Sequence, residues 1–183
     1  MEWGYLLDSP HDQRHSIYAV VVLLPERLER IVTPLRERYD PLYNQISPHI
    51  TLIYPFETDR PLDELAGIIR AETEGFAPVP VKLTSIGDFY PRIPKIYWNV
   101  EKNERLGELY YRLYSCLGVA IPYKSYQPHV TVAREISLHR VLLVKEKIVD
   151  YLPDESFDVT AVDMVTPLPG GRWVSVRTFP LRK

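Results

Sequence analysis

The 183-residue sequence contains one cysteine, Cys116. A single thiol cannot form an intramolecular disulfide, which excludes a secreted scaffold held by disulfides and favours a reducing compartment. The longest apolar stretch, residues 17–25, is far shorter than the ~20 residues that cross a membrane. The N-terminal segment lacks the basic and then apolar order of a signal peptide. We therefore expect a soluble, cytoplasmic protein with no membrane association.

A large excess of either charge is also absent. Lysine and arginine total 22 and aspartate and glutamate total 24, which gives a formal net charge of −2. This balance argues against a protein that holds long nucleic acid by bulk charge, but it is compatible with binding of a nucleotide or an RNA end. Hydrophobic residues make up 45% of the chain, which is enough for a buried core.

Several common functional motifs are missing. There is no glycine-rich phosphate loop, no Gly-x-Ser-x-Gly nucleophile motif and no pair of closely spaced cysteines. The Gly170-Gly171 pair follows a proline and predicts a hairpin turn instead. We therefore expect no metal and no cofactor.

Apolar periodicity predicts strands and helices in both halves of the chain. The predicted strands span residues 15–25, 50–54, 79–86, 96–100 and 129–133, followed by a hairpin of 157–166 with 172–179. The predicted helices span 26–39, 61–75, 103–117 and 137–151. Asn103 and Ser137 are the expected N-caps of the last two helices, and Gly118 the stop of the third. This mixed order predicts an α+β fold, with one domain over residues 1–183 made of two lobes.

One short motif occurs twice. Residues 48–52 read Pro-His-Ile-Thr-Leu, and residues 128–132 read Pro-His-Val-Thr-Val, 80 positions later. Side chains alternate along a strand, so His49 shares a face with Thr51, and His129 shares a face with Thr131. We expect one such strand in each of two antiparallel sheets with flanking helices. A pseudo-twofold axis between the lobes would then turn both His-Thr pairs toward a central cleft.

These residue types suit phosphoryl chemistry. A neutral imidazole takes a proton from water, and a protonated one gives a proton to a departing oxygen. Threonine hydroxyls donate hydrogen bonds to phosphoryl oxygens. The set requires no metal, because two histidines and two threonines without a carboxylate or thiolate make a poor zinc site. A lone His-x-Thr is usually incidental in a strand, but a second copy with the same neighbours favours function.

The two motifs resemble the signature of the 2H (two-histidine) phosphoesterase superfamily, which includes 2′-5′ RNA ligases and cyclic phosphodiesterases. The resemblance implies a bilobal fold and a metal-independent phosphoesterase acting on the 2′,3′-cyclic phosphate of a nucleotide or RNA 3′ end. It also implies reversible 2′-5′ RNA ligation in the same site. Carried onto this sequence, it makes His49 and His129 the catalytic acid–base pair and Thr51 and Thr131 phosphate-binding residues.

Other positions near the motifs are weaker candidates for the site, and several allow both a functional and a structural interpretation. Arg134 closes the second motif and is a candidate substrate-binding residue, or else a surface cation. Aromatic and basic residues at 89–95 and 123–126 either stack on a base or pack on their lobe. Tyr97 falls in a strand and is expected in the core. Tyr54 falls on the face opposite His49 unless its strand bulges.

Two further functions stay open at this stage. One is a module that binds a nucleotide or RNA end with little turnover, although a pure binder has no need of two imidazoles. The other is a phosphoesterase for a cyclic or diester substrate outside RNA. The near-neutral charge favours small substrates over long RNA. No sustained heptad appears, so we expect a monomer with no obligate protein partner.

Overall fold

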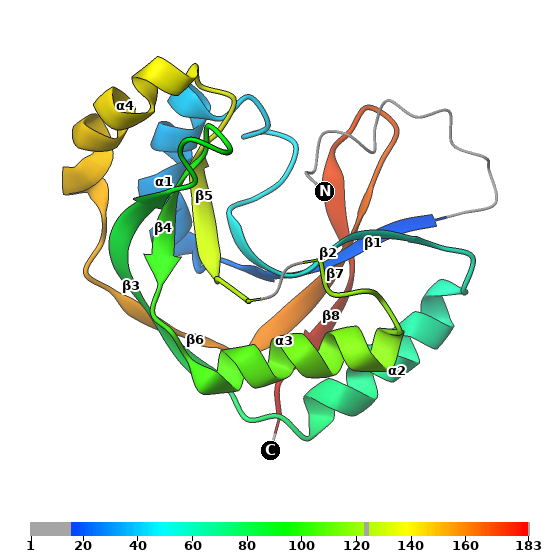
Figure 1. The fold of residues 1–183 in the computed structure, drawn as a ribbon. Coiled ribbons are helices and arrows are strands. Elements are labelled where there is room, and N and C mark those ends of the chain that lie inside the picture. The colour runs from blue at the N-terminus through cyan, green and yellow to red at the C-terminus, as the bar shows by residue number, and fades with distance from the viewer. Residues whose placement is uncertain (1–15, 123–124, 183) are drawn as a thin grey trace.

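The computed structural model describes residues 16–122 and 125–182 (Figure 1). Eight antiparallel strands form one curled sheet in the order β6-β3-β4-β5-β2-β1-β7-β8. The strands are β1 (Ser16–Leu23), β2 (His49–Thr58), β3 (Val79–Asp88), β4 (Ile96–Val100), β5 (His129–Ala133), β6 (Ser156–Val159), β7 (Ala161–Pro167) and β8 (Trp173–Pro180). The helices are α1 (Glu26–Tyr39), α2 (Leu62–Glu74), α3 (Glu104–Leu117) and α4 (Val141–Ile148). The predicted α+β class is confirmed.

The sheet consists of two four-stranded halves that meet between β5 and β2. One residue pair, Ile50 opposite Val130, joins the halves. The two predicted sheets are therefore continuous at this seam. The two strands that carry the repeated motif are the inner strand of each half, so they lie next to each other.

The helices cover the outside of the curled sheet. Helix α1 packs against β5, whereas α2 packs against β8 and α3 against β2. Figure 1 shows α1 and α4 beside the β3–β4–β5 half, and α2 and α3 beside each other along the other half. Arg112 on α3 and Glu72 on α2 form an ion pair of 2.8 Å between these two helices. The helices thus bury one face of the sheet and leave the inner face for the motif side chains.

The ends of α3 follow the sequence prediction. The Asn103 side chain accepts hydrogen bonds from the backbone N–H groups of Arg105 and Leu106, at 2.9 and 3.1 Å. Gly118 ends the helix with a φ of 68°, a left-handed conformation that glycine adopts without a side-chain clash. Asn103 is therefore the cap and Gly118 the stop, as predicted.

The predicted strand over residues 157–166 is wrong because it is two strands. β6 pairs with β3 at one edge of the sheet, whereas β7 pairs with β1 and β8 near the other edge. Only Thr160 separates Val159 from Ala161, and two residue steps reach about 7 Å at most. The chain can make this crossing only because the sheet curls until its two ends approach each other.

The predicted helix over 137–151 is also wrong in detail. Residues Leu138–Arg140 and Val149–Tyr151 form 3₁₀ turns on either side of the short α4. The Ser137 side chain makes no capping hydrogen bond; its carbonyl instead accepts from Arg140 N–H at 2.8 Å. Without a side-chain cap, the tighter i→i+3 bond satisfies an end group of the helix.

No helix within residues 16–122 and 125–182 combines the length and apolar character needed to cross a membrane.

The two faces of β2 and β5 differ in what they pack against. Ile50, Leu52, Val130 and Val132 are fully buried in the large apolar cluster. A smaller apolar cluster lies on the other face of β1 and includes Val21, the register partner of Thr51. Burial of alternate residues therefore fixes which face of β2 and β5 carries the polar motif side chains.

We predict that Ile50→Ala lowers the free energy of unfolding by about 2–5 kcal/mol, because the side chain is fully buried at the seam. Denaturant melts of the purified protein measure this change. Leu142→Ala is the control, because Leu142 is exposed and its truncation should change the stability by less than about 0.5 kcal/mol. Equal losses in the two variants would contradict a core that runs beneath the seam.

Candidate active site

The four motif side chains lie on one face of two neighbouring strands. Because Ile50 and Val130 are direct register partners and both are buried against the helices, the residues flanking each of them face the other way. The antiparallel register then sets His49 beside Thr131 and Thr51 beside His129. Histidines placed diagonally in this way are about 7–8 Å apart at their backbones. The predicted pairs are therefore related by a local twofold across the seam.

Both imidazoles are held by the same hydrogen bond. The Nδ1 atom of His49 lies 2.8 Å from the Ser47 carbonyl oxygen, and that of His129 lies 2.9 Å from the Gln127 carbonyl oxygen. A carbonyl only accepts, so Nδ1 carries the proton and Nε2 of the neutral ring carries the basic lone pair. The intervening prolines, Pro48 and Pro128, favour an extended backbone at the residues that supply these carbonyls.

Burial makes both histidines weak bases. Desolvation lowers the pKa of His49 to about 3 and that of His129 to about 4, although the carbonyl bonds partly oppose this effect. Positive charge from Arg36 and Arg134 lowers the His49 pKa further, and Lys95 and Arg134 act likewise on His129. Both rings are therefore neutral near pH 7 in the unliganded protein.

Arg134 belongs to a buried charge cluster, which overturns its reading as a surface cation. Arg134 is 7% exposed, and its Nε lies 2.9 Å from Oδ1 of Asp40. The second oxygen of that carboxylate lies 3.0 Å from Nε of Arg36. Two guanidinium groups thus share one carboxylate, and the cluster has a net charge of +1. The charge of Arg134 lowers the pKa of both imidazoles.

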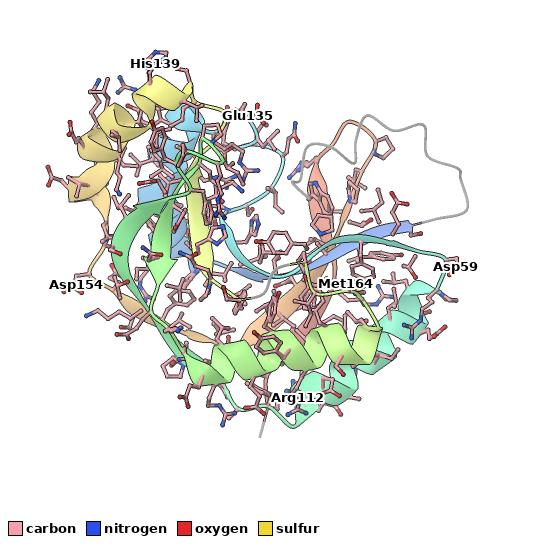
Figure 2. All side chains as sticks on the ribbon, in the orientation of Figure 1. Asp59, Arg112, Glu135, His139, Asp154 and Met164 are labelled. Atoms are coloured by element: carbon pink, nitrogen blue, oxygen red, sulfur yellow. The ribbon has the colours of Figure 1, made fainter. Side chains whose placement is uncertain are left out.

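The backbone turns sharply directly after Arg134. Glu135 has a φ of 55°, in the left-handed region that residues other than glycine, asparagine and aspartate seldom occupy. Figure 2 shows Glu135 at the end of β5, where the chain turns toward α4. The Arg134 N–H donates to the Tyr39 carbonyl oxygen at 3.0 Å, which ties this turn to the end of α1. Such local strain is kept where surrounding contacts fix the backbone, here at the residue that follows Arg134.

Two aromatic rings flank His129. The ring centroids of Phe89 and Tyr97 lie 5.3 and 5.0 Å from that of the imidazole. Gln127 Nε2 donates to the Tyr97 hydroxyl at 2.9 Å. A side chain at Gly87 would have its Cβ 2.5 Å from Tyr97 Cε2, so this position requires glycine while the ring stays there. Tyr97 is buried, as predicted, but it also borders the site.

The residues of the loop between β3 and β4 therefore differ in whether they contact the site. Phe89 packs against the site, with Lys95 Nζ 5.9 Å from its ring centroid. Tyr90 and Arg92 are exposed. Of the aromatic and basic residues noted before the second motif, Tyr123 and Lys124 lie outside the described residues.

Tyr126 links the segment before β5 to β2. Its hydroxyl donates to the Thr51 carbonyl oxygen at 3.1 Å, and its ring stacks on Tyr110 of α3 at 4.0 Å between centroids. Burial raises the pKa of Tyr126 well above its usual value, so the hydroxyl keeps its proton and remains a donor. This contact steadies the backbone of one motif from the segment that leads into the other.

Strand β2 bulges immediately after the first motif. Val21 pairs with Thr51, but its neighbour Val20 pairs with Ile53, which leaves one extra residue on β2. Ile53 consequently packs in the large core rather than beside His49. The bulge condition is thus met, so alternation along β2 no longer places Tyr54 opposite His49.

Asp40 and Arg36 are missing from the sequence-derived site. From the sequence alone, Asp40 marks only the end of the first predicted helix. A signal was nevertheless present: Arg36 continues the apolar 28, 32 series of α1 at a spacing of four, and Asp40 follows four residues later. Charged residues at buried helical positions are rarely unpaired, so this spacing indicates a buried ion pair.

Among residues 16–122 and 125–182, no group of three or more histidine, cysteine, aspartate or glutamate side chains is arranged to hold a metal ion.

The fold and the paired histidines are those of the two-histidine phosphoesterase class. A family model described as the 2′-5′ RNA ligase superfamily matches residues 24–170, and the chain belongs to this superfamily. A "Putative phosphoesterase" of Geobacillus kaustophilus is 33% identical over 165 residues, which cover 88% of this chain and 94% of the relative. One of the same name from Bacillus licheniformis is 34% identical over 169 residues, covering 90% and 98%.

Two solved structures share the fold. Escherichia coli LigT complexed with 3′-AMP has a TM-score of 0.66 at 14% identity, covering 92% of this chain and 99% of that one. TT0787 of Thermus thermophilus has a TM-score of 0.63 at 19% identity, covering 91% and 98%. The curled sheet with its outer helices is thus the architecture of this superfamily.

We predict that His49→Asn makes the stability less sensitive to acid. The folded ring stays neutral down to about pH 3, whereas an unfolded histidine takes up a proton below its pKa of about 6.5. Acid therefore favours the unfolded state, and stability is lost as the pH falls below 6.5. Between pH 7 and 5 the wild type should lose about 2 kcal/mol more than the variant.

Denaturant melts at several pH values measure this difference. Asparagine retains a donor for the Ser47 carbonyl, so the variant isolates the titrating ring. His139→Asn, which removes an exposed imidazole from a 3₁₀ turn, is the matched control. Parallel pH curves for the wild type and His49→Asn would contradict a buried neutral His49.

Proposed function

We propose that this protein hydrolyses the 2′,3′-cyclic phosphate of a nucleotide or RNA 3′ end, with no requirement for a metal, by acid–base catalysis between His49 and His129. The observation that carries the proposal is the matched pair of Nδ1–carbonyl bonds, 2.8 and 2.9 Å long. They support Nε2 of each ring as the atom that transfers a proton, on the face that also holds Thr51 and Thr131.

In this mechanism each ring has one task. The neutral imidazole takes a proton from water as the water oxygen bonds to phosphorus. The protonated imidazole gives its proton to the departing 2′ or 3′ ribose oxygen as the phosphorus–oxygen bond breaks. The product is a phosphate monoester. After the reaction the first ring is protonated and the second is neutral, so proton exchange with solvent restores the starting protonation states. The same steps with a 5′ hydroxyl in place of water, and with the 3′ oxygen departing, would give 2′-5′ ligation.

The remaining site residues hold the phosphate. Thr51 and Thr131 donate to the non-bridging oxygens, and Arg134 supplies the charge that stabilises them in the transition state. Bound phosphate also offsets the positive charge that lowers the histidine pKa values, so one ring can carry the acidic proton when substrate is present.

The relatives support a phosphate ester as the ligand. The curated relatives carry phosphoesterase names. LigT of Escherichia coli, which shares the fold, has been solved with phosphate and with 3′-AMP. A 3′-phosphate is what remains when the bond from phosphorus to the 2′ oxygen of a cyclic phosphate is broken.

We expect the purified protein to open 2′,3′-cyclic nucleotides in EDTA, with products resolved by chromatography. His49→Asn and His129→Asn should each lower kcat at least about a hundredfold, because each removes an Nε2 but keeps a donor for the Nδ1 bond. Thr51→Val and Thr131→Val should cost about tenfold or more. His139→Asn should retain wild-type activity, because that residue is exposed and lies outside the site.

The product isomer shows which oxygen departs. Absence of turnover, together with tight binding of the nucleotide, would replace the enzyme by the binding module. Turnover restricted to a non-RNA diester would change the substrate but keep the residues. A steep fall of affinity with salt would indicate many phosphate contacts and favour an RNA end over a mononucleotide.

The pH dependence should differ between the free protein and its complex. Productive encounter requires one protonated and one neutral ring, yet both pKa values lie near 3–4 in the free protein. The ratio kcat/KM should therefore fall by about tenfold per pH unit between pH 5 and 8. The alkaline fall of kcat should come at higher pH, because bound phosphate raises the pKa of the acidic ring. Steady-state assays across this range measure both curves, and a flat or rising kcat/KM would contradict the paired roles.

A further inference from the structure

Asp40 is the hub of the buried charge cluster. Its Oδ1 lies 2.9 Å from Arg134 Nε and accepts the Leu42 N–H at 3.0 Å. Its Oδ2 accepts from Arg36 Nε at 3.0 Å. The carboxylate is 2% exposed, so water screens these charges little. One side chain thus connects α1, the loop that leads to β2 and the turn after β5.

The two arginines are held differently. Arg36 also donates from Nη1 to the Ile46 carbonyl oxygen at 2.9 Å, so its guanidinium is bound to the loop as well as to Asp40. Arg134 meets Asp40 as an ion pair, with 2.9 Å between its Nε and Oδ1 of the carboxylate, and within the described residues that Nε forms no hydrogen bond. Its charge acts on both imidazoles. The guanidinium is therefore close enough to both imidazoles to attract an anion that binds beside them.

The same carboxylate sets the charge that such an anion meets. The buried cluster carries two positive charges and one negative charge, and the adjacent histidine rings are neutral in the free protein. A phosphodiester carries one negative charge, which this site balances. A phosphate monoester carries close to two at pH 8, because its second pKa is about 6. The second charge of the monoester has no buried partner.

We propose that Asp40 is a positioning and specificity-determining residue that orients Arg134 and limits the buried cluster to one net positive charge. It thereby favours the singly charged diester substrate over the doubly charged monoester product. The inference rests on the proposed function in that it assigns these two anions to the site. Its physical consequence is that hydrolysis converts a well-matched ligand into a poorly matched one, which promotes release.

The test compares two ligands that differ by one charge and cannot react. They are 2′-deoxyadenosine 3′-(methyl phosphate), a diester, and 2′-deoxyadenosine 3′-phosphate, a monoester. Neither has a 2′ hydroxyl, so neither forms a cyclic phosphate. Calorimetric titration at pH 8 gives the Kd of each, and the ratio of the diester Kd to the monoester Kd measures the charge preference.

Asp40→Asn should raise this ratio about tenfold. Removal of one negative charge strengthens binding of a single charge by about tenfold and of a double charge by about a hundredfold. A poorer orientation of Arg134 weakens both ligands alike, because both present the same phosphate oxygens. The ratio therefore reports the charge of the site and is insensitive to a general loss of structure.

Two further variants keep the test decisive. Arg36→Gln leaves Asp40 and Arg134 as a neutral pair, so the ratio should fall about tenfold, in the opposite direction. This variant tests the proposal even where Asp40→Asn does not fold, which thermal melts reveal. The double variant Arg36→Gln/Asp40→Asn returns the net charge to +1 and should return the ratio to the wild-type value.

A ratio that stays unchanged in Asp40→Asn and Arg36→Gln would overturn the proposal. Because the probes do not react, the outcome is independent of turnover. Failure of the wild type to open any cyclic phosphate would remove the proposed function but leave the charge preference measurable. Normal turnover with an unchanged ratio would remove only the role of Asp40.

Discussion

The pairing of Ile50 with Val130 is the constraint on which the site depends. Both side chains are fully buried beneath the seam, so the free energy of apolar burial fixes the inner face of each strand. A slip of one residue in either strand would move its histidine and threonine into the core and its aliphatic residues into the site. The hydrophobic core therefore specifies the positions of four polar side chains that it does not contact through hydrogen bonds. This explains why the two aliphatic positions of each motif matter as much as the polar ones.

Register places the imidazoles, and the backbone then orients them. Each Nδ1 is bonded to the carbonyl two residues earlier, across a proline that favours the extended conformation. Local features of the Pro-His-x-Thr motif thus orient its polar side chains. The proline, the carbonyl before it and the strand alternation together place one Nε2 and one hydroxyl on the same face. Two copies on adjacent antiparallel strands are related by a local twofold axis because of the strand pairing alone. The buried charges are not part of the motif, since they come from α1 and from the turn after β5.

The repeated motif and alternation were sufficient to predict His49, Thr51, His129 and Thr131 as a set on one face, together with most helices and strands. The sequence could not predict that the motif strands pair directly, because strand order depends on contacts between distant segments. It could not predict that the chain passes from one half of the sheet to the other at Thr160. The apolar alternation continues through this residue, so the sequence does not show that the strand changes its pairing partner. The Arg36–Asp40 pair escaped prediction for a related reason: its function depends on Arg134, which lies almost a hundred residues away and meets it only in the folded chain.

The chemical state of the free site conflicts with the proposed acid–base roles. Desolvation, helped by the nearby guanidinium charge, holds both rings neutral. An acid–base pair with both members neutral lacks its acid. Under the proposed function, a bound phosphate would oppose the guanidinium charge, which adds to the effect of desolvation, and would raise the pKa of one imidazole. The ligand that reacts would then also supply the condition for protonating one ring, and so complete the catalytic pair.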